Sequence, residues 1–271
     1  METIGIKKST YFYKKKTRHR KKKPYPLDSE LCRVLASLTG YELTLGYRKT
    51  TEYIRKKHKK EWNKKKVYRH MKELKLLQPK KIKPKKYPNT QLARCCATRS
   101  NVRWEADLTY VRYPGGYAYL FAVEDTYDKE IVGEHISYRC RADEAVSSLE
   151  KAVFYRFKGK KPKGLELIIR VDRGCQYTAQ PFYDFCNSQG IQLEFCGVQT
   201  PNDKPYIESF IGCYKREEVY RNEYQNFLDV CRGWNNYLKW YHELRPHGSL
   251  NFLSPAEFKK QAKSSLIAIS F

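Results

Sequence analysis

Three acidic residues far apart in the chain have the types and settings expected of ligands for divalent cations. Asp107 lies in an alternating run, W-E-A-D-L-T-Y, and Asp172 ends an apolar run, L-E-L-I-I-R-V-D. Glu208 lies in P-N-D-K-P-Y-I-E-S-F. Attack on a phosphodiester requires neutralisation of charge on the entering and leaving oxygens, and two Mg²⁺ ions held by carboxylates supply it. The sequence therefore predicts that these acids converge on a pair of metal ions.

Each acid also has a simpler interpretation. Asp107 can be a solvent-facing strand residue, and Asp172 can close the turn that contains Gly174, because Asp before Gly is common in turns. Glu208 can form a surface ion pair with Lys204, four positions earlier on a helix. The order of the surrounding elements favours the metal site over these three separate alternatives.

Those elements are the strands and helices of an α/β sheet. Alternation predicts a strand at 103–113, and a hairpin turn at 114–116 leads to a second strand at 117–125 and a third at 130–137. A helix at 142–157, a strand at 165–172, a helix at 179–188, a strand at 191–196 and helices from about 204 and about 224 follow. Three meandering strands before alternating helices and strands predict a mixed sheet flanked by helices. Asp172 would then end the strand beside that of Asp107, where open α/β sheets bind ligands.

Positive charge is concentrated in the first third of the chain. Residues 1–100 contain 31 of the 54 Lys and Arg but only 7 of the 29 Asp and Glu. Such a segment favours binding to a polyanion. Double-stranded DNA is the partner that we expect, since each phosphate neutralised by Lys or Arg releases a condensed counterion and so strengthens binding. The sequence has no apolar run of about 18 residues, so we expect no membrane partner and a cytoplasmic, nucleoid-associated protein.

The basic region divides into an arm, a folded unit and a linker. We expect a disordered arm at 1–26, an all-α helix-turn-helix domain at 27–78, a basic linker at 79–100, a catalytic core at 101–262 and a tail at 263–271. Asp28 and Asn63 are predicted N-caps of the first and third helices. The third helix is expected to lie in the major groove, with DNA contacts from Lys64, Lys65, Lys66 and Arg69. The alternative is a small bundle with a solvated basic face.

Four motifs together resemble a known family. W-E-A-D-L-T-Y, V-D-R-G-C-Q-Y-T, P-N-D-K-P-Y-I-E-S-F-I-G-C-Y-K-R-E and R-P-H-G-S-L-N-F-L-S-P-A-E-F occur in this order over residues 100–259. They resemble the catalytic half of bacterial insertion-sequence DDE transposases of the second-reading-frame type, which belong to the retroviral integrase superfamily with an RNase H-like fold. Residues 44–78 resemble the helix-turn-helix that precedes that core.

The resemblance implies a mechanism, a cofactor and partners. It implies 3′-end cleavage at terminal inverted repeats and strand transfer by one-step transesterification, with Asp107, Asp172 and Glu208 as catalytic metal ligands. The cofactor would be Mg²⁺, two per active site, with Mn²⁺ as a substitute. Lys215 and Arg216 would contact DNA, with Lys204 on the same helix face. We also expect a homo-oligomer on element-end and target DNA, and a DNA-binding partner from an upstream reading frame.

Two positions depart from the family pattern. Arg170 stands where the family often has His, and Lys204 stands where it often has Asn. Both are expected to place extra positive charge near the metals, which would strengthen phosphate binding or weaken metal binding. Two rival functions therefore remain open at this point. One is a non-catalytic DNA-binding regulator derived from a transposase, and the other is a ribonuclease H-type hydrolase.

Overall fold

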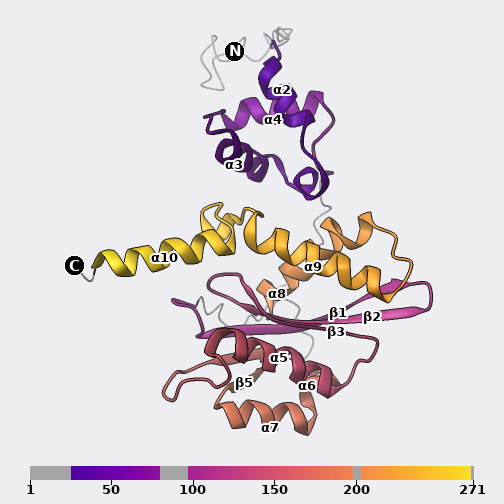
Figure 1. Cartoon of the computed structure of the whole chain (residues 1–271), viewed down its shortest axis with the longest axis vertical. Helices are drawn as coiled ribbons and strands as arrows, with labels where there is room; N and C mark the ends of the chain where they lie inside the picture. The colour runs from indigo at the N-terminus through magenta and orange to yellow at the C-terminus, as the bar shows by residue number, and fades with distance from the viewer. Residues whose placement is uncertain (1–25, 80–96, 198–202, 270–271) are drawn as a thin grey trace, which may run out of the picture.

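A small helical unit and a larger sheet-containing unit follow one another along the chain (Figure 1). The computed structural model describes residues 26–79, 97–197 and 203–269. Nearly all of the predicted arm and most of the predicted linker therefore lie outside the described residues.

The first unit is the predicted set of three helices. They are α2 (Ser29–Ala36), α3 (Tyr47–His58) and α4 (Lys64–Glu73), with a 3-10 turn, η1 (Gly40–Thr44), between the first two. Asp28 Oδ1 accepts the N–H groups of Glu30 and Leu31 at 3.0 and 3.1 Å, and Asn63 caps α4. Both predicted N-caps are confirmed. The apolar stripes meet in one cluster around Leu31, Leu35, Ile54, Val67 and Met71.

The second unit contains a five-stranded mixed sheet. Its order is β3-β2-β1-β4-β5, with β1 at Arg103–Tyr113, β2 at Gly116–Asp125, β3 at Ile131–Ser137, β4 at Ile168–Val171 and β5 at Gln192–Phe195. The first three strands pair antiparallel, whereas β4 and β5 run parallel to β1. This is the predicted RNase H-like arrangement. The strand predicted at 165–172 is shorter than expected: it is a strand only at Ile168–Val171, which pairs with the first residues of β1.

Helices cover both faces of the sheet. α5 (Ala142–Phe157), the short α6 (Cys175–Thr178) and α7 (Gln180–Gln189) lie on one side, and α8 (Pro205–Glu217) and α9 (Phe227–Glu243) lie on the other (Figure 1). Each face of the sheet has its own hydrophobic core. Along β1, Trp104 and Ala106 belong to the core on the side of α5 and α7, whereas Val111 belongs to the core on the side of α8 and α9. The predicted alternation of β1 is thus confirmed. Glu105 and Asp107, at odd positions, consequently point to the side of α8 and α9.

The helical unit rests on α9 and the C-terminal segment rather than on the sheet. Tyr41 stacks on Trp240 with ring centroids 5.7 Å apart and donates a hydrogen bond to Glu218 at 2.6 Å. Lys56 pairs with Glu257 at 2.7 Å. Glu257 belongs to α10 (Pro255–Ile269), which follows the short turns η2 (Val219–Arg221) and η3 (Gly248–Leu250).

The helix α10 was not predicted from the sequence. Its backbone stays helical to residue 269, where a tail from 263 was expected. Within the described ranges, no helix has the length and apolarity needed to cross a bilayer.

Candidate active site

The start of α8 is fastened to β1 by a buried carboxylate. Glu105 Oε2 accepts the backbone N–H groups of Tyr206 and Ile207 at 2.9 and 3.0 Å, and Glu105 is 1% exposed. These N–H groups belong to the first turn of a helix, which has no intrahelical acceptor for them and carries partial positive charge. Burial raises the pKa of Glu105, and the two N–H groups oppose that rise. Glu105, two residues before Asp107 on β1, therefore holds the first turn of α8 against this strand.

Asp107 and Asp172 are brought side by side by the register of the sheet. The parallel pairing of β1 with β4 sets Glu105 opposite Arg170, so the two aspartates, each two residues further on, lie at the same level: Asp107 within β1 and Asp172 just after the end of β4. One ammonium joins them: Lys204 Nζ lies 3.0 Å from Asp107 Oδ1 and 3.3 Å from Asp172 Oδ2.

The turn role of Asp172 is also present. Asp172 Oδ1 accepts the Gly174 N–H at 2.8 Å, while its other carboxylate oxygen faces Lys204. The turn that holds one oxygen therefore orients the other toward the acidic site. The simple interpretation and the functional one are compatible for this residue.

Glu208 lies in the first turn of α8 and interacts electrostatically with Asp107. Burial and then the negative charge of Asp107 raise the pKa of Glu208. The pKa of Asp107 is raised by burial, the charge of Asp172 adds to the rise, and the Lys204 ammonium opposes it. Asp107 therefore interacts electrostatically with Asp172 and with Glu208. As they stand, however, no three His, Cys, Asp or Glu side chains in the described part of the chain are close enough to hold a metal ion.

Comparison with known proteins finds integrase-core models and insertion-sequence transposases among the matches. The model for "Integrase core domain" matches residues 97–201, a second integrase core model matches residues 189–255, and that for "HTH-like domain" matches residues 33–86. The transposase for insertion sequence element IS904 of Lactococcus lactis is 28% identical over 60% of this chain and 63% of its own length. The putative transposase InsK for IS150 of Escherichia coli is 26% identical over 96% of this chain and 92% of its own length. The chain contains an integrase core and is homologous to transposases of bacterial insertion sequences.

Among solved structures, the HTLV-2 integrase catalytic core domain in complex with magnesium aligns with a TM-score of 0.45 and 18% identity, covering 59% of this chain and 97% of that one. The alignment with the IS904 transposase covers less than two thirds of that protein's length.

The two departures from the transposase pattern have different outcomes. The guanidinium of Arg170 is directed away from the two aspartates: it donates to Glu194 Oε1 at 2.9 Å and to the Asp203 carbonyl at 2.6 Å. Glu194 on β5 also pairs with Arg103 at 2.7 Å, so Arg170 shares this counter-ion. Lys204 does add its charge, as expected, but directly between Asp107 and Asp172.

The predicted DNA contacts on α8 are also divided. Lys204 was expected on a DNA-facing side of the helix, yet it is the N-cap residue of α8 and its side chain is 5% exposed. It is therefore not placed as a surface phosphate contact. Lys215 lies with its ammonium 5.5 Å from the ring centre of the exposed Tyr110, and Arg216 is exposed one residue further on.

The predicted contacts on α4 border a groove. Lys64, Lys65 and Arg69 line it together with Tyr47, Arg48, Tyr68 and Phe252. Lys66, the fourth predicted contact, instead pairs with Asp28 at 2.5 Å, so its charge reinforces the N-cap of α2. Sequence reasoning missed Tyr47 and Arg48, because they lie on α3 and only folding brings them beside α4. It also missed Tyr68, which lies on α4 itself.

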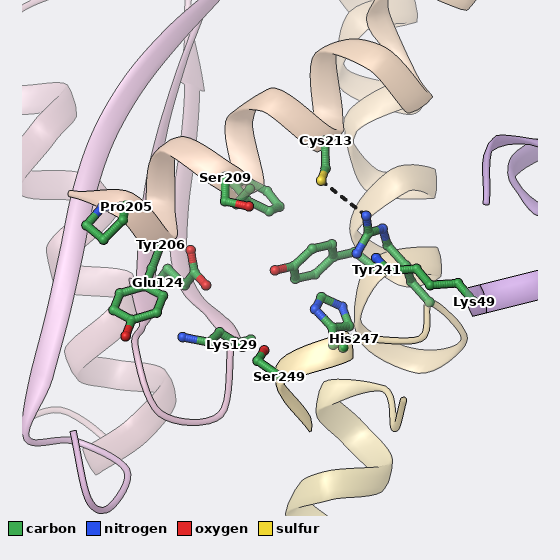
Figure 2. A pocket seen from close by; sticks show the side chains of 13 residues that line it. Lys49, Glu124, Lys129, Pro205, Tyr206, Ser209, Cys213, Tyr241, His247 and Ser249 are labelled. Atoms are coloured by element: carbon green, nitrogen blue, oxygen red, sulfur yellow. Dashed lines mark hydrogen bonds between the residues drawn. The ribbon is translucent and has the colours of Figure 1, made fainter. Parts of the chain in front are cut away.

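A separate pocket lies on another side of α8 (Figure 2). Its volume is about 320 Å³, and Tyr206, Ser209 and Cys213 line it from α8; helical spacing sets this face apart from Glu208. Lys49 enters it from α3 of the helical unit (Figure 2). Burial lowers the pKa of Lys49 to about 8. Sequence patterns gave no sign of this pocket, since its lining comes from both units.

Proposed function

We propose that this chain is a catalytically active transposase that cleaves 3′ ends at the terminal inverted repeats of an insertion sequence and transfers them to target DNA. Asp107, Asp172 and Glu208 are its proposed catalytic residues. The observation that carries this proposal is the meeting of Asp107 and Asp172 on one cation at the carboxyl end of β4. Two carboxylates from separate strands are held together there, with a third acid in the adjoining first turn of α8.

The donor set suits Mg²⁺ or Mn²⁺. Asp107, Asp172 and Glu208 offer only carboxylate oxygens, the hard ligands that these ions prefer, and the shared Lys204 ammonium shows that the position favours a cation. The three acids would hold the metal, two ions per active site in our proposal. When bound, the ions would neutralise charge on the entering and leaving oxygens of the phosphodiester.

The protein groups around the acids have positioning and binding roles. Glu105 holds the first turn of α8 and so keeps Glu208 beside Asp107. Lys215 and Arg216 are proposed to contact phosphates about two turns beyond Glu208, and the exposed ring of Tyr110 under Lys215 can stack on a base. No covalent protein–DNA bond is needed, because the freed 3′ hydroxyl is itself the nucleophile.

Duplex binding is proposed for the groove at α3 and α4. Its cations can neutralise phosphates, and its tyrosines add amphipathic contact surface. We propose residues 27–78 as the DNA-binding domain and residues 101–262 as the catalytic domain. Pairing two element ends requires at least two protomers, so we propose a homo-oligomer on DNA, with an upstream-frame protein as a further partner in end recognition.

Asp172→Asn tests the active-site assignment. The substrate is labelled DNA from the regions that flank the coding sequence, incubated with Mg²⁺. The wild type should release 3′ ends and form joined products. Asp172→Asn should lose activity by about 10²-fold or more, the loss typical when one electrostatic stabiliser of a transition state is removed.

Asp184→Asn is the matched control, because Asp184 is an exposed acid on α7. It should cleave like the wild type. Equal activity of Asp172→Asn and the wild type would refute the assignment. Binding without cleavage by the wild type would instead indicate a regulator, and cleavage of RNA–DNA hybrids without joined products would indicate a hydrolase.

A further inference from the structure

Lys204 occupies the position between the acids that a metal ion would need. Its ammonium contacts Asp107 Oδ1 at 3.0 Å, Asp172 Oδ2 at 3.3 Å and the Ala106 carbonyl at 3.3 Å. All three partners are oxygens, and the lysine side chain is 5% exposed. An ammonium surrounded by oxygens from two strands is a monovalent substitute for a divalent cation.

We propose that Lys204 is a built-in counter-ion that holds the acidic site together in the metal-free chain and that metal binding displaces it. The inference rests on the proposed function, in which Asp107 and Asp172 are metal ligands, and it describes how loading of that site is regulated. Metal then binds by exchange for the ammonium rather than by entry into an open site. The apparent metal affinity is lowered by the stability of the two ion pairs that must break.

Two carboxylates held side by side repel one another unless a cation lies between them. Lys204 removes that repulsion before any metal arrives, and the partly buried pair is screened little by salt. Removal of one partner from a buried ion pair is strongly destabilising, because the remaining charge is left without compensation. Lys204 is therefore expected to stabilise the metal-free fold and to compete with the metal for the same oxygens.

The backbone around Lys204 is fixed, so the exchange must occur by movement of its side chain. The Asp203 carbonyl accepts from Arg170 at 2.6 Å, and Glu105 accepts the N–H groups of Tyr206 and Ile207. These bonds hold the chain on both sides of Lys204. The long lysine side chain can swing away by rotation about its own bonds, whereas the Asn often found here in relatives is too short to span both acids.

The test compares metal-free stability with metal affinity in the wild type and in Lys204→Asn. The melting temperature is measured in EDTA, and Mn²⁺ binding is measured by calorimetry without DNA. Lys204→Asn should melt at a lower temperature in EDTA, bind Mn²⁺ about ten-fold more tightly or better, in the range seen for groups that tune metal ligands, and gain a larger thermal shift on Mn²⁺ addition.

Two further variants separate this effect from general damage. Lys239→Asn removes an exposed lysine of α9 and should change neither quantity. In Lys204→Asn/Asp172→Asn only Asp107 keeps its charge at the ion-pair position, so much of the lost stability in EDTA should return, a coupling that a double-mutant cycle measures. If Lys204→Asn does not fold in EDTA, recovery of its circular dichroism on Mn²⁺ addition is the expected result, and no recovery would count against the inference.

The failures of the two proposals are distinguishable. Unchanged Mn²⁺ affinity and unchanged melting in EDTA for Lys204→Asn would overturn the counter-ion role, whatever the activity of the chain. Identical Mn²⁺ binding by the wild type and Asp172→Asn would instead remove the proposed metal site itself. Weaker Mn²⁺ binding by Lys204→Asn would also overturn the inference, because it would make Lys204 a support of the metal site rather than its competitor.

Discussion

Glu105 offers the sharpest test of how the fold positions the acidic site. Glu105→Ala removes the acceptor of two N–H groups at the start of α8. Hydrogen bonds to charged groups contribute about 1.5–3 kcal/mol each, and loss of an N-cap costs about 1 kcal/mol. Part of this is offset, because Glu105 lies opposite the buried Glu124 in the β1–β2 register and the two carboxylates repel. We expect a net loss of about 2–4 kcal/mol in the free energy of unfolding.

Glu105→Gln is the matched variant, because it keeps an oxygen acceptor and removes the charge. Its amide oxygen can still accept from α8, and its NH₂ group lies on the strand facing Glu124, whose Oε2 has no hydrogen-bond partner among the described residues. We therefore expect Glu105→Gln to unfold within about 1 kcal/mol of the wild type. Urea unfolding followed by circular dichroism measures both values.

The two variants should also differ in catalysis. A shift of α8 by about 1 Å would misplace Glu208 and can cost about 10²-fold in rate. Glu105→Ala should thus lower the rate of DNA cleavage at saturating DNA, while Glu105→Gln retains most of it and neither changes affinity for duplex DNA. Wild-type cleavage by folded Glu105→Ala would refute the claim that this carboxylate positions Glu208.

Two other predictions concern the helical unit. Because burial lowers the pKa of Lys49 from 10.5 to about 8, the unfolded chain binds more protons between these values and stability rises with pH across that window. Lys49→Met should therefore stabilise the chain by up to about 3 kcal/mol at pH 7 and by much less above pH 10.5; an equal effect in urea unfolding at both pH values would contradict the desolvated charge. Lys65→Ala, in the α4 groove, should weaken duplex binding similarly for all sequences and reduce the salt slope of the binding constant by about 1; an unchanged slope in fluorescence anisotropy would remove Lys65 from the interface.

The local patterns of the sequence predicted most of the fold. Alternation placed the odd residues of β1 on one face, and the 3.6-residue stripes placed α2 and α4 around one cluster, because each pattern reports which side of an element is buried. Asp28 and Asn63 were recognisable as caps because a cap bonds to residues two or three positions away. The helix α10 was not predicted, and no pattern in residues 263–269 distinguishes a helix from a tail.

The sequence by itself determined the element order, the faces of β1 and α8, and the three acids as candidates for one site. Only the tertiary structure decided which charges meet. Three contacts join residues from separate elements: Lys204 with Asp107, Arg170 with Glu194, and Glu105 with the start of α8. Periodicity predicts which way a side chain points but not which residue it contacts. The physical reason is that a buried charge takes the partner that packing brings within reach, and packing is settled by the whole sheet and its helices.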